Sequence, residues 1–269
     1  VVSAEYLNYE KYDDDEDAWY YADGSGKLYA GEFKTIKGKK YAFRTDGRMV
    51  SGLKFISDDG NGNFVVKADD NDEAAFGPFD TEDDFLANAP VYEAQGYKCY
   101  YFGDGDDGAM RTNKTSITID GDKFNFYFQK SGGNKGAGIT GEKDDKYYQS
   151  GMLMTAGSDE KYQIITPIMN GTQLVGYDKY ADVADLVDGN IFRQETSYTD
   201  ASLRTLGINK DADEIAELYV PVAAASAQDH ILINTSGKVI DNKGKSKDGN
   251  DYYYVVNGSK KVVAIYLEN

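Results

Sequence analysis

The stretch Trp19–Gly52, WYYADGSGKLYAGEFKTIKGKKYAFRTDGRMVSG, contains one short unit written twice. In each copy an aromatic run leads into a polar Asp-Gly turn and then into a second apolar run. Asp23-Gly24 and Asp46-Gly47 supply the positive φ angles that a tight hairpin needs, so we predict a β-hairpin in each copy. Four pairs of like residues lie 21 positions apart: Tyr20 and Tyr41, Gly26 and Gly47, Leu28 and Met49, and Gly31 and Gly52.

A hairpin this short cannot bury a face by itself, so we expect the units to stack on one another. Tyr127, Gly133 and Gly138 repeat the spacing of Tyr20, Gly26 and Gly31. The frame also recurs with a longer turn at Tyr100–Met110 and a shorter one at Tyr147–Leu153, and parts of it return at Ile231–Val239 and Tyr252–Tyr254. The predicted fold is therefore mainly β, with stacked β-hairpin repeats that form a β-solenoid-like array and carry short helical insertions.

The presence or absence of the repeat pattern divides the chain into six segments. They are an acidic N-terminal lead-in at 1–17, β-hairpin repeats at 18–56, an insertion with a short helix at 57–96, further repeats at 97–155, an irregular insertion or subdomain with short helices at 156–229, and C-terminal repeats at 230–269.

The first insertion and the repeats after it carry local signals. Residues 58–63 read as a turn and residues 64–67 as a strand. Thr81, followed by Glu82, Asp83 and Asp84, predicts a helix start, because a helix N-terminus favours acidic side chains. Period-two patterning predicts strands at 116–119 and 124–128.

In the second insertion, residues 156–229, the sequence predicts only short strands and helices. Residues 162–166 predict a strand that ends at Pro167. A helical stripe covers 183–187, a turn or short helix opens at Asp200, and residues 213–218 predict another helix.

Composition excludes several classes of partner. The formal net charge is −17, which disfavours nucleic acid and anionic membranes because both would repel the chain.

The one cysteine, Cys99, excludes an intramolecular disulfide framework and fits a small buried side chain. No apolar run is long enough to span a membrane. The chain begins at Val1 rather than Met, as in a processed or truncated secreted protein.

Catalytic and metal-binding patterns are weak. His230 has no Ser, Cys or Asp arrangement around it that indicates a triad. The Asp-rich stretches 69–73 and 104–108 miss the calcium-loop pattern, and we interpret them as turns. We therefore expect no enzyme activity, no cofactor and no metal site.

The frame WYY-x-x-x-G-x-G-K-L-Y-x-G followed by GKKYAFRTDGRMVSG resembles the cell-wall-binding repeats of Gram-positive surface proteins, of the choline-binding and glucan-binding type. The match is close over 18–56 and recognisable over 97–155 and 230–266. The resemblance implies an extracellular protein at the cell wall or cell surface. Its expected partner is a cell-wall polysaccharide or a peptidoglycan-associated glycan, with choline as a further possibility.

In that family, aromatic rings of adjacent repeats hold the ligand, either around a quaternary ammonium or as platforms for sugars. The chain has one Trp where choline-binding repeats bring one in nearly every unit, which favours sugar contact through tyrosines. The positions that match are Trp19, Tyr20, Tyr21, Tyr41, Phe43, Tyr100, Tyr101, Tyr147 and Tyr148.

The favoured function is a non-catalytic surface protein that binds cell-wall or other polysaccharide. Two alternatives stay open: a structural spacer or adhesin region that contacts a host protein, and the targeting region of a larger wall-acting enzyme.

Overall fold

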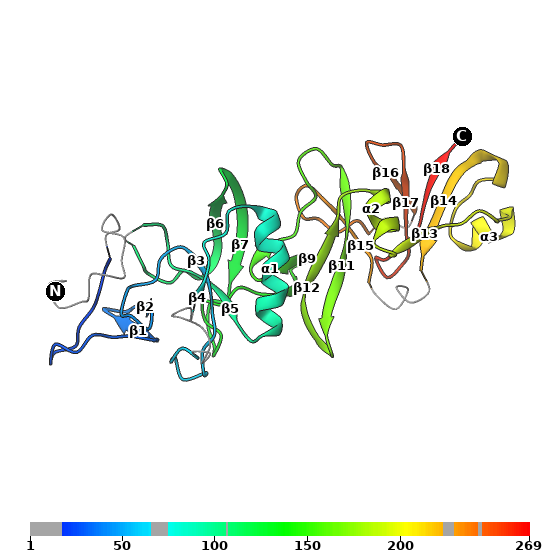
Figure 1. Cartoon of the computed structure of the whole chain (residues 1–269). Helices are drawn as coiled ribbons and strands as arrows, with labels where there is room; N and C mark the ends of the chain where they lie inside the picture. Colours follow the sequence, from blue (N-terminus) through cyan, green and yellow to red (C-terminus); the bar gives the residue numbers. More distant parts are fainter. Residues whose placement is uncertain (1–17, 66–74, 106, 223–228, 242–243) are drawn as a thin grey trace. The chain divides into compact units, whose positions relative to one another are not determined.

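The computed structural model describes residues 18–65, 75–105, 107–222, 229–241 and 244–269. The fold is mainly β and consists of several small antiparallel sheets (Figure 1). Contacts group the chain into two compact units, one of residues 1–139 with 150–152 and the other of residues 140–149 with 153–269. The predicted lead-in at 1–17, the end of the predicted strand at 66–67 and the Asp-rich stretch 69–73 lie outside the described residues.

The first unit contains one helix and three sets of paired strands among its described residues. Strand β1 (Glu32–Ile36) pairs with β2 (Lys39–Phe43), and β3 (Leu53–Ile56) lies between β4 (Ala75–Phe76) and β5 (Lys98–Tyr101). Strand β6 (Asn113–Ile119) forms a hairpin with β7 (Asp122–Phe128), and Met152 of β10 (Met152–Leu153) pairs with Phe126. The helix is α1 (Glu82–Ala94). The strands predicted at 116–119 and 124–128 are thus confirmed.

The two copies of the 21-residue unit have the same backbone hydrogen bonds. An isolated bridge joins Ala22 to Leu28 in the first copy and Phe43 to Met49 in the second. The turn closes through Asp23 N donating to Lys27 O and, 21 residues later, Arg44 N donating to Arg48 O, each at 2.8 Å. Both predicted short hairpins are present, and a third, unpredicted hairpin of β1 and β2 lies between them. The glycines with positive φ in the two turns are Gly26 and Gly47, so the prediction for Gly24 was wrong.

An Asp or Asn side chain organises the turn in several hairpins. Its Oδ1 accepts hydrogen bonds from the backbone N–H groups two and four residues further on, at 2.8 to 3.1 Å. These two hydrogen bonds give the N–H groups of the turn a side-chain acceptor in place of a backbone carbonyl, and so stabilise the tight turn. The turn predicted at 58–63 is one of these. The residues that act in this way are Asp23, Asp59, Asn234, Asp248 and Asn257.

Helix α1 starts where the acidic residues predicted it. The Thr81 hydroxyl accepts a hydrogen bond from Asp84 N at 3.0 Å, which satisfies one of the free N–H groups of the first turn. Phe85 and Ala89 are fully buried on the inner face. The Phe85 ring lies 5.8 Å from Phe55 and 5.6 Å from Phe126, so the helix closes the core of the first unit.

The second unit holds two sheets, a hairpin and short helices among its described residues. One sheet has the order β12 (Gln173–Tyr180), β11 (Tyr162–Asn170), β15 (Ile231–Asn234). The other has the order β13 (Phe192–Gln194), β14 (Ile215–Pro221), β18 (Val262–Glu268), β17 (Tyr253–Val256), β16 (Gly244–Lys247). The remaining elements are the hairpin β8 (Gly141–Lys143) and β9 (Lys146–Gln149), and the helices α2 (Val183–Asp188), α3 (Asp200–Thr205) and η3 (Ala212–Glu214).

Two local predictions for this unit were wrong. Strand β11 continues through Pro167, which pairs in register with Tyr177. Since β15 pairs only with 162–165, no strand on that side needs an N–H from Pro167. Residues 215–218 form strand β14 rather than a helix, because β13 and β18 pair with β14 on its two sides and this pairing outweighs the local preference. The helices predicted at 183–187 and from Asp200 are confirmed as α2 and α3.

Cys99, the one cysteine of the chain, is a buried free thiol, and its predicted burial is confirmed. His230 is 2% exposed, precedes β15 by one residue, and its ring lies 5.1 Å from Phe192. Both side chains therefore belong to the cores of their units.

Candidate functional site

Four of the nine predicted platform residues are core residues. Phe43, Tyr100, Tyr101 and Tyr148 are 6% exposed or less. The Tyr100 hydroxyl donates to Asp58 Oδ2 at 3.3 Å, and the Tyr101 hydroxyl donates to Asp104 Oδ1 at 2.7 Å. These rings pack between strands, so they offer no open face for a ligand.

The other five predicted residues reach the surface to different degrees. Trp19 is 52% exposed and Tyr21 is 41% exposed, whereas Tyr20, Tyr41 and Tyr147 are half-buried. Tyr21 stacks on Tyr29 with a centroid distance of 5.8 Å and an interplanar angle of 10°. Sequence reasoning missed Tyr29, although it directly follows Leu28 in the 21-residue unit.

A cavity of about 560 Å³ lies beside Trp19 in the first unit. Arg44, Arg48, Lys54 and Asp104 also line it. Arg48 Nε lies 3.8 Å from Asp46 Oδ2, and Lys54 Nζ donates to the carbonyl oxygen of Gly77. The cavity therefore combines one exposed aromatic face with several N–H donors, and we call it the Trp19 cavity.

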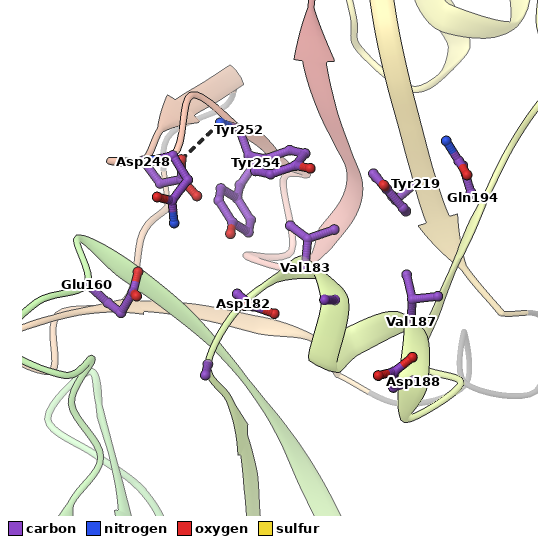
Figure 2. A pocket seen from close by; sticks show the side chains of 13 residues that line it. Glu160, Asp182, Val183, Val187, Asp188, Gln194, Tyr219, Asp248, Tyr252 and Tyr254 are labelled. Atoms are coloured by element: carbon purple, nitrogen blue, oxygen red, sulfur yellow. Dashed lines mark hydrogen bonds between the residues drawn. The ribbon is translucent and has the colours of Figure 1, made fainter.

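A second cavity of about 560 Å³ lies in the second unit. Figure 2 shows Val183 and Val187 of α2 facing Tyr252, Tyr254 and Tyr219. Val183 and Tyr254 are 5% and 4% exposed and form the floor, so Val187, Tyr219 and Tyr252 offer the accessible surfaces. We call it the tyrosine groove. None of its residues was on the predicted platform, although Tyr252–Tyr254 were read as the opening of a repeat. The charged and amide side chains of its lining are Glu160, Asp182, Asp188, Gln194, Asp248 and Asn250.

The tyrosine hydroxyls of the groove stay protonated at neutral pH. Burial raises the pKa of Tyr254 far above its ordinary value, and the nearby Asp248 carboxylate adds to the effect. Burial also raises the pKa of Tyr219, together with its hydrogen bond to Glu217. A neutral hydroxyl can donate a hydrogen bond to a ligand and can also accept one from it.

Among the described residues, no group of three or more His, Cys, Asp or Glu side chains is placed to hold a metal ion. No helix in that part of the chain is long and apolar enough to cross a bilayer.

Comparison with known proteins gave partial matches. No protein-family model matches the chain. The chain is 33% identical over 127 residues to Glucosyltransferase-S of Streptococcus mutans serotype c. This match covers 44% of the chain and 8% of the relative, so the chain spans a small part of that protein's length.

The solved structures found are more distant. Choline binding protein F from Streptococcus pneumoniae shares 20% identity over 51% of this chain and 44% of that one, with a TM-score of 0.18. CbpJ from Streptococcus pneumoniae TIGR4 shares 16% identity over 90% and 83%, with a TM-score of 0.30. Alternansucrase in complex with isomaltononaose shares 16% identity over 91% and 14%, with a TM-score of 0.20. TM-scores in this range do not establish a shared fold.

Proposed function

We propose that this chain is a non-catalytic cell-surface protein, or part of one, that binds cell-wall polysaccharide or a related glucan through the hairpins of its first unit. The observation that carries the proposal is the Trp19 cavity. A half-exposed indole ring borders a hollow whose lining includes the hydrogen-bond donors Arg44, Arg48 and Lys54. Flat aromatic faces contact the C–H face of a sugar, while N–H donors and carboxylates bond its hydroxyl groups.

The backbone between the hairpins supports a repeating array. Gly31 N donates to Arg44 O at 2.9 Å and Met49 N donates to Trp19 O at 2.7 Å, so the first copy of the unit is bonded directly to the second. Gly52 N donates to Gly103 O at 2.7 Å, which links the second copy to the next hairpin. Each hairpin thus supplies bonds to its neighbour, which is how solenoids stabilise short repeats. We infer a β-solenoid-like stack in this unit.

The sequence relative supports a glucan as the ligand class. The matched protein is named as a glucosyltransferase, and the matched stretch is a small share of its length. The similarity covers 8% of the glucosyltransferase. Such a short shared segment is consistent with a binding module that holds the glucan. We also propose that the chain has no catalytic role and lies at the cell surface.

Retention on insoluble α-glucan and on purified Gram-positive cell walls tests the proposal. Trp19→Ala should weaken retention roughly tenfold, the loss typical of a buried aromatic contact. Val91→Ala is the matched control, because Val91 is 50% exposed in the same unit and does not line the cavity.

Adding choline separates two ligand classes. Choline is added at ~10 mM, well above the dissociation constant of a typical weak site. Retention that survives choline supports binding to sugar. Release by choline would mean that the ligand is a quaternary ammonium group instead. If neither matrix retains the wild-type chain, the polysaccharide proposal is wrong and a protein partner becomes the better candidate.

A further inference from the structure

We propose that the tyrosine groove is a second saccharide-binding groove, and that it takes glycan segments without anionic groups. It lies in the second unit, between α2 and three tyrosines: Tyr219 of β14, Tyr254 of β17 and Tyr252 just before β17 (Figure 2). Its lining comes largely from residues 156–229, which do not follow the repeat frame. The choice of a saccharide rests on the proposed function, whereas the exclusion of anions rests on the groove alone.

Two of the rings are held in place before any ligand binds. The hydroxyls of Tyr219 and Tyr252 both donate to Glu217 Oε2, each at 2.8 Å. The two rings lie 6.2 Å apart at an angle of 70°. A shared acceptor for both hydroxyls fixes the orientation of both rings. Ligand binding then loses less side-chain entropy, which favours affinity.

The opposite wall of the groove is apolar and rigid. Val187 of α2 faces the tyrosines (Figure 2) and is 36% exposed, whereas the neighbouring Val183 is 5% exposed and packs beneath it. The helix is anchored below by Leu186, which is 1% exposed, and at its start by Asp182 Oδ1, which accepts from Asp185 N at 2.9 Å. An apolar wall facing fixed rings fits the C–H face of a hexose.

The polar lining sets the charge of the ligand. Glu160, Asp182, Asp188 and Asp248 contribute carboxylates, and the described lining contains no Lys or Arg. Carboxylates accept hydrogen bonds from sugar hydroxyls and attract ammonium groups. They repel carboxylates and phosphates in the same space. The groove should therefore prefer amine-bearing hexoses to neutral ones, and should reject uronic acids.

The test uses the full chain with labelled valine methyl groups and three oligosaccharides of equal length. These are a glucosamine oligomer, a neutral α-1,6-glucose oligomer and a galacturonate oligomer. The methyl signals of Val183 and Val187 report on the tyrosine groove. Trp19 fluorescence reports on the first unit, because the chain has a single Trp. We expect the first two oligomers to shift the Val187 signal, the glucosamine oligomer at the lower concentration, and the galacturonate oligomer to leave it unchanged.

Two variants and a control locate the effect. Tyr252→Ala should weaken binding at the Val187 signal by roughly tenfold. Asp188→Lys should remove the advantage of the glucosamine oligomer, and it should not harm folding because Asp188 is exposed at the C-terminal end of α2, where a positive charge is favoured. Asp159→Lys makes the same charge change at an exposed residue that does not line the groove, and should change nothing.

Three outcomes would overturn all or part of the inference, and a fourth would support it. Trp19 fluorescence that responds while the Val187 signal does not would refute the groove and leave the proposed function standing. Equal response to the galacturonate oligomer would refute the charge rule. Oligolysine is added as a fourth probe: a Val187 response to it but to none of the sugars would identify a site for basic peptides instead. A Val187 response without any Trp19 response would support the groove and count against the Trp19 cavity.

Discussion

Gly138 lies where two backbone segments of the first unit almost touch. A Cβ at this position would meet the carbonyl oxygen of Ser150, and would lie 2.5 Å from the carbonyl carbon of Ser150 and 2.8 Å from Gly151 N. All three atoms are backbone, so no side chain can rotate away. To restore an ordinary contact, one segment has to move by roughly 1 Å.

The expected cost of Gly138→Ala follows from that movement. Overpacking against backbone costs about 1–3 kcal/mol. The movement also disturbs the hydrogen bonds from Gly138 N to Cys99 O at 2.8 Å and from Gly151 N to Ile139 O at 2.7 Å, each worth about 1 kcal/mol. We therefore expect the free energy of unfolding to fall by about 3–5 kcal/mol.

Urea denaturation followed by Trp19 fluorescence measures this loss, because Trp19 and Gly138 belong to the same unit. With a slope of about 2 kcal/mol per molar urea, the midpoint should fall by about 1.5–2.5 M. Gly133→Ala is the matched control, since a Cβ there meets nothing within 4 Å. Its midpoint should stay the same or rise slightly, because alanine restricts the unfolded chain. A Gly138→Ala midpoint equal to that of the wild type would refute the reasoning.

Three further predictions concern a turn, a tyrosine and the cysteine. Asn257→Ala removes the acceptor of the N–H groups of Ser259 and Lys261 and should cost about 1–2 kcal/mol, measured by urea denaturation of the second unit; Asn257→Asp keeps the acceptor and should cost less. Burial, with the charge of Glu142 next, raises the pKa of Tyr147 to about 12. The folded state thus holds this proton more tightly, so its contribution to stability is complete below about pH 10 and is lost as the pH rises toward 12. Unfolding measured across that range should show the decline, and Tyr147→Phe should reduce it. Burial also raises the pKa of the Cys99 thiol, so an alkylating reagent should label it in urea and not in the native protein; native labelling at the denatured rate would contradict the burial.

Local chemistry in the sequence predicted the hairpin units. The 21-residue spacing, the Asp and Gly residues of the turns and the acids after Thr81 act on atoms only a few residues away, so they need no partner segment. The same reasoning failed where spacing alone was compared. Tyr127, Gly133 and Gly138 repeat the spacing of Tyr20, Gly26 and Gly31, yet the bridge joins Phe128 to Gly138. This hairpin has a longer turn than the first two.

Only the tertiary structure decided which aromatic residues are available to a ligand. Trp19 and Tyr101 match the same repeat frame, but one is half exposed and the other is covered by strands of its unit. The tyrosine groove could not be predicted either, because α2, β14 and β17 supply its walls from separate parts of the sequence. Residues 215–218 became a strand for the same reason. Turns are fixed by neighbours along the chain, whereas burial, strand pairing and cavities are fixed by segments that meet only after folding.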